Sequence, residues 1–392
     1  MKPDISNLIT WFPLKQQIER FYPFTFRELK ELEDLLDFSI ISCNQRIEWN
    51  EAILEEFSHN YCWAGLSSNP SVKWTPDLIE KYRNYIDWHH ATGNKSFPWT
   101  KILFFRFKDL MDWDTLDDLP IRLNADDIGL LKKEQIWNLA RFENVEWEIS
   151  LIECYKDQLD WTCIGRNRAM PYSEYFFNKY KHKIFYYIEF LVNSWLLRDE
   201  NLPFMEKFAM IEFGLLSEYK EDWTLEFIEE HEDQLNWDNL SLNEHLPWSR
   251  EFLMKYEEKW NWFDMSGNKS VPWTWELIEK HEHEWNWRED DDPNVSLYRT
   301  MTNNPSLPWS RKFVERFGHH LSFGSTEQVG DNEYEIRFGV SSNQLIDWDI
   351  DFLMKYKDQW DIEALKSNEA VYTAIENHLG KGQMCNLLKF LN

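Results

Sequence analysis

Apolar and aromatic residues recur along this chain with a period of 25 residues. The clearest copy runs from 248 to 272: Trp, Ser, apolar residues at helical spacing, two further tryptophans, and then Asn and Pro, after which Trp273 begins the next copy. Each repeat is numbered from zero at its opening aromatic residue, so that positions 12 and 14 are apolar and position 20 is Asn. Repeats open at Phe24 (a degenerate copy), Trp49, Trp74, Trp99, Trp147, Tyr172, Trp223, Trp248, Trp273, Trp309 and Trp348. The position-20 Asn is lost after Trp99, and the repeats at Tyr172, Trp273 and Trp309 carry insertions.

The first half of each repeat predicts a helix. Position 1 is usually Ser or Thr, which is typical of a helix N-cap, and an acidic residue often follows in the first turn, where it interacts favourably with the helix dipole. Apolar residues at three- and four-residue spacing then give one buried face over about ten residues. Apolar positions 12 and 14 hold the chain to the core afterwards, and we expect a short second helical turn there.

The Asn at position 20 belongs to a turn, because Ser, Gly and Asn precede a Pro that ends any helix. Its side chain carries both hydrogen-bond donors and an acceptor. We expect it to satisfy backbone groups that the stacking of repeats buries.

Stacked copies of such a repeat form an α-solenoid, so the predicted fold is all-α, with about 11–13 short helical repeats of 25 residues and terminal caps. The predicted N-terminal cap spans 1–23, the tandem Trp-rich repeats span 24–368, and the C-terminal cap spans 369–392. The pattern is degenerate around 117–146 and 187–222, and it carries insertions around 288–300 and 322–342.

A leucine-rich-repeat horseshoe is the main alternative fold, because that family also combines about 25 residues with a recurring Asn. Its pattern needs a leucine at what is here position 15, and this chain lacks it. Position 15 is occupied by Ala64, His89, Asp238 and Phe263. The sequence L-S-x-N-x-x-L-P-W-S at 240–249 instead resembles the tryptophan-rich tandem repeats of uncharacterised bacterial and large-DNA-virus proteins. That resemblance covers roughly 24–368 and implies a repeat fold, but it implies no known activity.

Composition and charge narrow the classes of function. Apolar residues make up 43% of the chain and aromatic residues 17%, which excludes disorder caused by low hydrophobicity. No stretch approaches the roughly 20 apolar residues of a membrane span, and the first residues lack the layout of a secretory signal, so we expect a cytoplasmic protein that does not bind membranes. The 69 acidic and 42 basic residues give a formal charge of −27. This charge disfavours direct contact with nucleic acid and favours a partner protein with a basic surface.

Two other motifs are explained better by the repeat than by chemistry. Gly93-Asn94-Lys95-Ser96 superficially resembles a phosphate-binding loop, but it lacks the earlier glycine and the preceding strand, and it lies at the turn of a repeat. The ladder of tryptophans lies among acidic residues, so it is interpreted as core packing and not as a platform that stacks bases. The five cysteines contain no CxxC pair and predict neither a disulfide framework nor a zinc site.

The histidines also lack a functional pattern. His231 and His281 occupy position 8, where other repeats have Tyr or Phe, and are interpreted as partly buried aromatic substitutes. The groups at 89–90, 281–283 and 319–320 lack the i, i+4 spacing of a helical zinc site. The sequence therefore predicts no catalytic, cofactor-binding or metal-binding residue and no cofactor.

One insertion carries an acidic run, Glu289, Asp290, Asp291 and Asp292. Clustered carboxylates also suit a hard divalent cation, although the spacing of an EF-hand is absent. We interpret the run as an exposed loop and as the candidate partner-binding segment.

The predicted function is a non-enzymatic scaffold or adaptor that binds another protein along an acidic extended surface. The alternative is an acidic inhibitor, of the immunity or anti-defence type, that blocks the basic site of a nucleic-acid-binding partner. An enzyme assembled from distant repeats has no support in the sequence.

Overall fold

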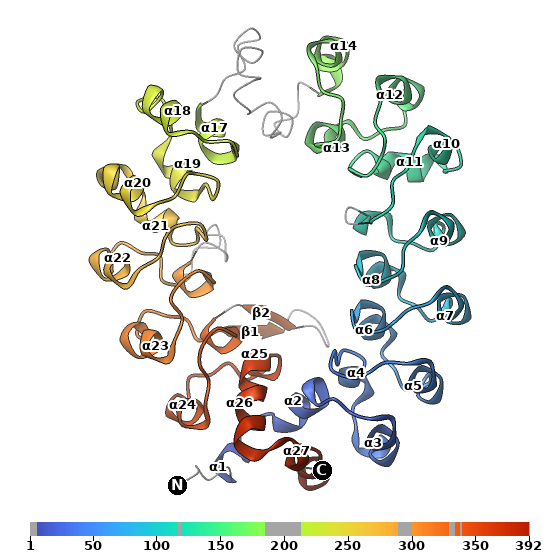
Figure 1. Ribbon diagram of the computed structural model, residues 1–392, viewed down its shortest axis with the longest axis vertical. Helices are drawn as coiled ribbons and strands as arrows, with labels where there is room; N and C mark the ends of the chain where they lie inside the picture. Colours follow the sequence, from blue (N-terminus) through green and yellow to red (C-terminus); the bar gives the residue numbers. More distant parts are fainter. Residues whose placement is uncertain are drawn as a thin grey trace. The chain divides into compact units, whose positions relative to one another are not determined.

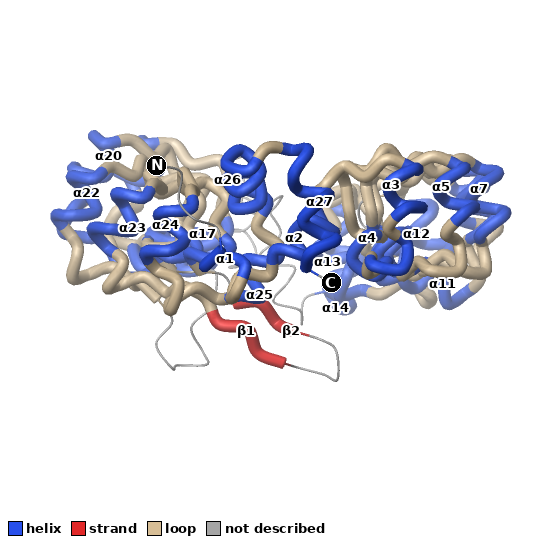
Figure 2. Tube along the Cα trace, turned by 90° about the horizontal axis from the view of Figure 1, so that it is seen from below, coloured by secondary structure: helices blue, strands red, loops and turns tan. Residues whose placement is uncertain are grey.

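The computed structural model describes residues 6–116, 119–184, 213–288, 300–328, 334–337 and 339–391. The chain divides into two compact units: unit 1 is Met1–Ile47 with Asn236–Asn392, and unit 2 is Glu48–Leu235. The described residues are mainly helical (Figures 1 and 2), which confirms the predicted helical class, and the tandem packing of helices within each unit is compatible with an α-solenoid. None of the described helices has both the length and the apolar character needed to cross a membrane.

Each regular repeat contains a first helix of six or seven residues and a second helix or 3-10 turn of three to six residues, and Figure 1 shows the two kinds of helix as two adjacent rows. In unit 2 the first helices are α5 (Glu51–Glu56), α7 (Pro76–Tyr82), α9 (Lys101–Phe107), α12 (Ile149–Tyr155), the longer α14 (Glu174–Ile184) and α18 (Leu225–Glu230). Their second helices are α6 (Trp63–Ser68), α8 (Trp88–Gly93), the 3-10 turn η2 (Trp113–Thr115) and α13 (Trp161–Arg166). The degenerate region holds α10 (Ala125–Ile128) and α11 (Lys133–Leu139), and α17 (Phe213–Tyr219) precedes α18.

Unit 1 has the same organisation. Its first helices are α3 (Phe26–Glu31), α20 (Arg250–Lys255), α22 (Trp275–Lys280), α23 (Arg311–Phe317) and α24 (Ile350–Lys355). Its second helices and 3-10 turns are α4 (Phe38–Ile41), α19 (Trp237–Leu242), α21 (Trp262–Met265), η5 (Met301–Asn303), η6 (Val340–Ser342) and α25 (Ile362–Lys366). Short turns η1 (Glu33–Leu35) and η4 (Glu257–Lys259) follow α3 and α20, and the terminal helices are α1 (Ser6–Ile9), α2 (Leu14–Phe21), α26 (Glu369–Leu379) and α27 (Lys381–Leu391).

The predicted N-caps are present. The hydroxyl of Ser249 accepts a hydrogen bond from the backbone N–H of Phe252 (3.0 Å), as a Ser N-cap does. The first helices are shorter than the ten residues predicted: α20 ends before Tyr256, which has φ −116° and ψ 25°. The turn that follows returns Trp260, at position 12, to the core. A second cap lies at position 13, where Asn261 accepts from the N–H of Asp264 (3.1 Å) and begins α21.

Aromatic contacts join neighbouring repeats. The aromatic residue at position 14 packs against the aromatic residue at position 8 of the next repeat, as Trp237 does against Tyr256, with ring centroids 4.8 Å apart. The same contact joins Trp63 to Tyr82, Trp88 to Phe107, Trp161 to Tyr180, and Trp262 to His281. The core therefore continues from one repeat to the next and is not enclosed within single repeats.

The Asn at position 20 is a second link between repeats, as predicted. Asn268 donates from Nδ2 to the carbonyls of Ser241 (3.0 Å) and Asn243 (3.2 Å) in the preceding repeat. Its Oδ1 accepts from the backbone N–H of Ser270 (3.0 Å), which closes the turn. The same paired donation is made by Asn44, Asn94, Asn167, Asn304 and Asn368.

The second insertion contains a β-hairpin, which the repeat pattern did not predict. Strands β1 (Ser325–Gln328) and β2 (Tyr334–Arg337) pair antiparallel, with Ser325 opposite Arg337. Figure 2 shows both strands at one edge of the helices of unit 1. Of the first insertion, expected around 288–300, residues 289–299 lie outside the described residues.

The two terminal segments of unit 1 contact each other. Helix α2 packs against α25, α26 and α27, and Leu14, Ile18 and Tyr372 in this contact are almost completely buried. Gln17 on α2 donates from Nε2 to the carbonyls of Leu365 (2.6 Å) and Asn368 (3.2 Å). The segments predicted as two separate caps therefore lie against each other in this unit.

Candidate functional site

The candidate partner-binding loop expected from the sequence, Glu289, Asp290, Asp291 and Asp292, lies outside the described residues.

The tetrapeptide 93–96, whose sequence superficially resembles a phosphate-binding loop, forms a turn. Asn94 donates to backbone carbonyls of the preceding repeat, and its Oδ1 accepts from the N–H of Ser96 (2.9 Å). The interpretation of this tetrapeptide as structural is confirmed.

The interpretation of the position-8 histidines as aromatic substitutes is confirmed as well. The ring of His281 stacks on Trp262 with centroids 3.8 Å apart and planes 20° apart, and the side chain is 7% exposed. Its Nδ1 lies 2.8 Å from Oε1 of Glu284. The ring of His231 lies between Phe213 and Phe227, at 5.3 and 4.4 Å.

The adjacent histidines His89 and His90 in unit 2 contact two different carboxylates. His89 Nδ1 lies 2.5 Å from Oδ2 of Asp112, and His90 Nδ1 lies 3.0 Å from Oδ1 of Asp87. The hydrogen bond with Asp112 raises the pKa of His89, and the same bond lowers the pKa of Asp112. Each histidine therefore forms its own ion pair when protonated.

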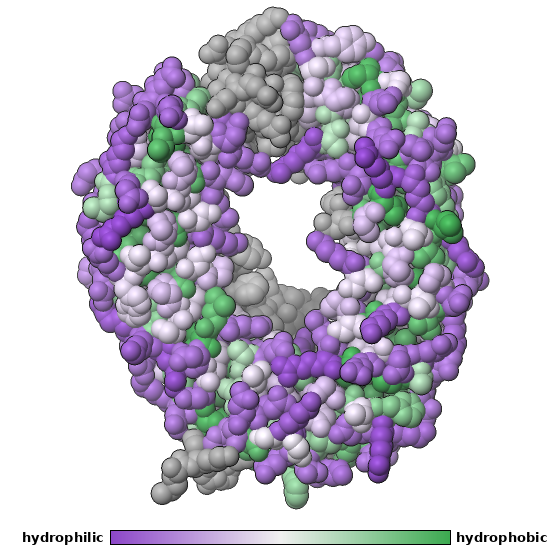
Figure 3. Space-filling model, viewed as in Figure 1, coloured by the Kyte–Doolittle hydropathy of each residue, from purple (hydrophilic) through white to green (hydrophobic). Residues whose placement is uncertain are grey.

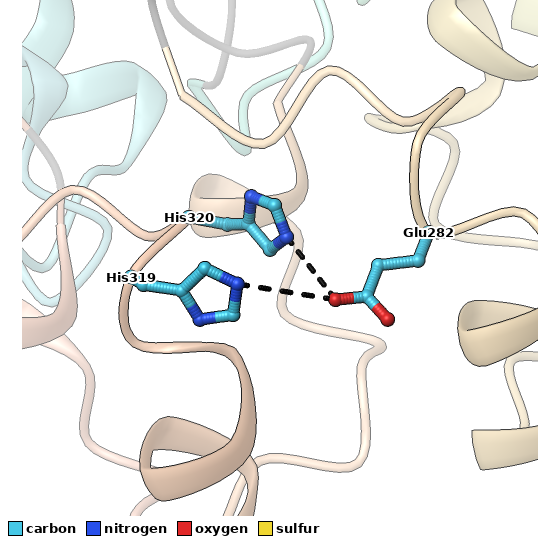
Figure 4. Close-up of side chains that lie close together, drawn as sticks. All are labelled: Glu282, His319 and His320. Atoms are coloured by element: carbon cyan, nitrogen blue, oxygen red, sulfur yellow. Dashed lines mark hydrogen bonds and ion pairs between the residues drawn. The ribbon is translucent and has the colours of Figure 1, made fainter.

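The second pair, His319 and His320, meets a single carboxylate (Figure 4). Both histidines lie in the turn after α23, and Glu282 lies in the corresponding turn after α22 of the preceding repeat. Nε2 of His320 is 3.1 Å from Oε1 of Glu282, and Nε2 of His319 is 4.0 Å from the same oxygen. Two imidazole nitrogens and one carboxylate oxygen thus converge within 4.8 Å.

The surroundings of this cluster set its charge. Arg316 donates to both oxygens of Glu282, from Nη1 to Oε1 (3.1 Å) and from Nη2 to Oε2 (2.7 Å), and these bonds lower the pKa of Glu282. Burial lowers the pKa of His320, whose ring stacks on Trp287 with planes 11° apart. These surroundings favour the ionised form of the Glu282 carboxylate and the neutral form of the His320 imidazole.

The spacing of histidines within one helix does not indicate this cluster, because its residues come from two consecutive repeats. Glu282 occupies position 9 of its repeat, and His319 and His320 occupy positions 10 and 11 of the next. These positions form the turn after the first helix in every regular repeat. Comparing equivalent turns of consecutive repeats is the signal that brings the three residues together.

A second feature of unit 1 is an apolar groove between α20 and α22. Its volume is about 120 Å³, and Leu253, Met254 and Leu277 line it. Met254 is 55% exposed and occupies position 6, which is Glu in most other repeats. Met254 therefore adds apolar surface to the groove at a position where most repeats have a carboxylate.

The other repeats show what Met254 replaces. A basic residue at position 7 pairs with the position-6 acid of the preceding repeat, as in Arg106 with Glu80 (2.8 Å). The same pairing joins Lys81 to Glu55, Lys179 to Glu153, Arg316 to Glu279 and Lys355 to Glu315. Lys280 occupies position 7 of the repeat that follows Met254. Because Met254 has no carboxylate, Lys280 pairs with Glu257.

Charged residues line the rim of the groove. Glu257 pairs with Lys280, and the exposed Glu276 lies in the first turn of α22. Glu276 contacts Arg250 at 2.9 Å, and such an exposed pair contributes little to stability. Figure 3 shows hydrophilic residues over much of the visible face, with hydrophobic residues in separate small patches.

No protein-family model matches this chain, and the comparisons found no similar curated protein and no similar solved structure.

Proposed function

We propose that this protein is a non-enzymatic, cytoplasmic scaffold that binds a partner protein with a basic, amphipathic surface along the first helices of unit 1. The observation that supports this proposal most directly is the apolar groove between α20 and α22, which is lined by the carboxylates of Glu257 and Glu276 together with their partners Lys280 and Arg250. The groove suits an apolar side chain of the partner, and the carboxylates suit basic residues next to that side chain.

The two parts of this surface have different physical roles. Buried apolar anchors contribute most of the affinity of a protein interface. Exposed charges act mainly on the association rate and on its dependence on salt. The excess of 69 acidic over 42 basic residues gives the chain a field that accelerates encounter with a basic partner. The run Glu289 to Asp292 adds four carboxylates to this field, and we propose that it also acts through the association rate.

The groove is tested with Met254→Glu. This substitution installs the acid that most repeats have at position 6, so we expect the fold to be retained. Proteins captured by the tagged chain from its native host are purified, and their binding to each variant is measured at low and high salt. We expect Met254→Glu to weaken binding at least about tenfold.

The matched control is Ile102→Glu on α9 of unit 2, which also replaces an exposed apolar side chain (80% exposed) by an acid. We expect it to leave binding unchanged. A partner that binds the Met254→Glu variant and the wild type equally, without dependence on salt, contradicts the proposal. Competition between that partner and nucleic acid would instead favour the acidic-inhibitor function.

A further inference from the structure

We propose that Glu282, His319 and His320 form a site for a divalent transition-metal ion of the zinc class, which links two consecutive repeats of unit 1. This inference is independent of the proposed partner binding. It rests on the convergence of three ligand atoms from the turns after α22 and α23.

The ligand types and distances suit such an ion. Zinc binds imidazole nitrogen at about 2.0–2.1 Å and carboxylate oxygen at about 2.0–2.2 Å, so two ligand atoms of a tetrahedral site lie about 3.3 Å apart. The separation of His320 Nε2 from Glu282 Oε1 is 3.1 Å, and that of His319 Nε2 from the same oxygen is 4.0 Å. Small rotations of the exposed His319 side chain are enough to complete the set. Three protein ligands leave the fourth position to water.

The three ligand side chains are held in place by their neighbours, and an ion can reach them from solvent. The ring of His320 is stacked on Trp287 with centroids 4.9 Å apart, which fixes the direction of its Nε2. The side chain of His319 is 63% exposed, so an ion reaches the site directly from solvent. The Glu282 side chain is 15% exposed and is oriented by Arg316.

Arg316 is the main competitor for the carboxylate. Its Nη1 bonds to Oε1 of Glu282 (3.1 Å), the oxygen that both histidines approach, while its Nη2 bonds to Oε2 (2.7 Å). A metal ion on Oε1 replaces only the first of these bonds, and the second continues to orient the carboxylate. The guanidinium charge nevertheless opposes a cation so close by. Removing this charge is therefore expected to strengthen metal binding.

The test uses the full-length chain after treatment with a chelator. Zinc is titrated by calorimetry, and cobalt(II) is titrated by visible absorption, which reports tetrahedral nitrogen and oxygen coordination. We expect one ion per chain, with the affinity lowered at least about tenfold in Glu282→Gln and in His320→Phe. The Phe variant keeps a ring to stack on Trp287, so loss of binding in it does not reflect loss of packing. We expect Arg316→Gln to bind the ion more tightly than the wild type.

The matched control is the double variant His89→Ala, His90→Ala, which removes the other adjacent histidine pair. That pair faces two separate carboxylates, so we expect its removal to change neither the stoichiometry nor the cobalt spectrum. Absence of saturable binding to the wild type overturns the proposal. Binding that persists unchanged in Glu282→Gln and His320→Phe overturns it as well, because it places the ion elsewhere.

Discussion

Two kinds of junction join the repeats of unit 1, and they make equivalent hydrogen bonds with different side chains. At the regular junction between α19 and α21, Asn268 donates to two carbonyls of the preceding repeat (3.0 and 3.2 Å), and the hydroxyl of Ser241 accepts from the N–H of Asn261 (2.9 Å). At the terminal junction, Gln17 donates to the carbonyls of Leu365 and Asn368. Helix α2 thus makes the hydrogen bonds to the last repeat that a further repeat would make.

The hydrogen bond that a Ser or Thr hydroxyl accepts at a regular junction also has a different acceptor here. On the other side of α2, the backbone N–H of Asp37 donates to Oε1 of Glu19 (2.9 Å), where a regular junction has a Ser or Thr hydroxyl as acceptor. Asn44 then donates to the carbonyls of Glu19 (2.8 Å) and Tyr22 (2.9 Å), which resumes the regular pattern of the first repeat. The ladder of side-chain to backbone bonds therefore continues from the last repeat through α2 to the first.

Gln17 and Glu19 are less completely hydrogen-bonded than the Asn and the Ser or Thr that occupy a regular junction. Among the described residues, Oε1 of Gln17 has no hydrogen-bond partner, whereas Oδ1 of Asn268 accepts from Ser270. Glu19 is 1% exposed, and burial raises its pKa to about 7. Polar groups that are buried without full pairing cost stability, so the terminal junction is expected to be the weaker one. The comparison teaches that the backbone geometry of the junction, more than the identity of one residue, defines the repeat.

The largest effect is expected at the regular junction. Asn268→Ala leaves two buried carbonyls and the N–H of Ser270 without their side-chain partner, and three lost bonds of about 1 kcal/mol each lower the free energy of unfolding by roughly 3 kcal/mol. Urea unfolding followed by tryptophan fluorescence measures it. An unchanged midpoint would show that the ladder does not hold the repeats together.

Glu19→Gln tests the terminal junction through pH. The folded state binds a proton at Glu19 more readily than the unfolded state, so the stability of the wild type falls as pH rises from about 4.5 through about 7. Lys15 (3.9 Å) is the charged partner that opposes this shift. The Gln variant has no such penalty. We expect it to be more stable than the wild type by about 3 kcal/mol at about pH 8, and about equally stable at about pH 4. A constant difference across this range would contradict the assignment.

A smaller effect is expected for Gln17→Ala. The variant leaves two carbonyls without their donor, but it also removes the unpaired Oε1, so we expect a loss of about 1 kcal/mol. The neighbouring Gln16→Ala is the matched control, because Gln16 is only partly buried and should change stability by less than about 0.5 kcal/mol. A loss for Gln17→Ala as large as that for Asn268→Ala would remove the distinction between the junctions.

The smallest effect is expected for Arg46→Gln. Arg46 contacts Glu369 (2.7 Å) and Glu376 (3.7 Å) on α26, and its side chain is 30% exposed. Partly exposed ion pairs contribute less than about 1 kcal/mol and are screened by salt. Thermal unfolding at low and high salt is the measurement, and the gap between variant and wild type should shrink as salt is raised.

The regular part of the fold was predictable because its determinants lie within one period. Ser249 at position 1 and Asn268 at position 20 repeat at fixed offsets, so their cap and ladder roles followed from the sequence alone. The strand pair 325–328 and 334–337 was not predictable from the period, because an insertion does not follow the repeat pattern. The role of Gln17 was hidden for a different reason: an amide on a helix carries no position in the repeat, and only the packing of α2 shows what it replaces.

The candidate site was less predictable than the fold. The groove depends on Met254, at a position where most other repeats carry a Glu, which in several of them pairs with the next repeat. A comparison of position 6 across consecutive repeats indicates the groove. The cluster at Glu282 depends on two turns that the intervening insertion separates in the sequence, so the spacing rules for a single helix did not apply to it.

The most direct test of the continuous ladder is hydrogen exchange followed by mass spectrometry on the wild type and on Gln17→Ala. The two helices that meet at the terminal junction, 14–21 and 369–379, are compared with the regular first helices 250–255 and 275–280. We predict that 14–21 and 369–379 exchange at a common rate, that both accelerate in the variant, and that the regular helices stay unchanged. Acceleration confined to 14–21, with 369–379 as protected as in the wild type, would show that α2 is a separate end segment and would contradict the account.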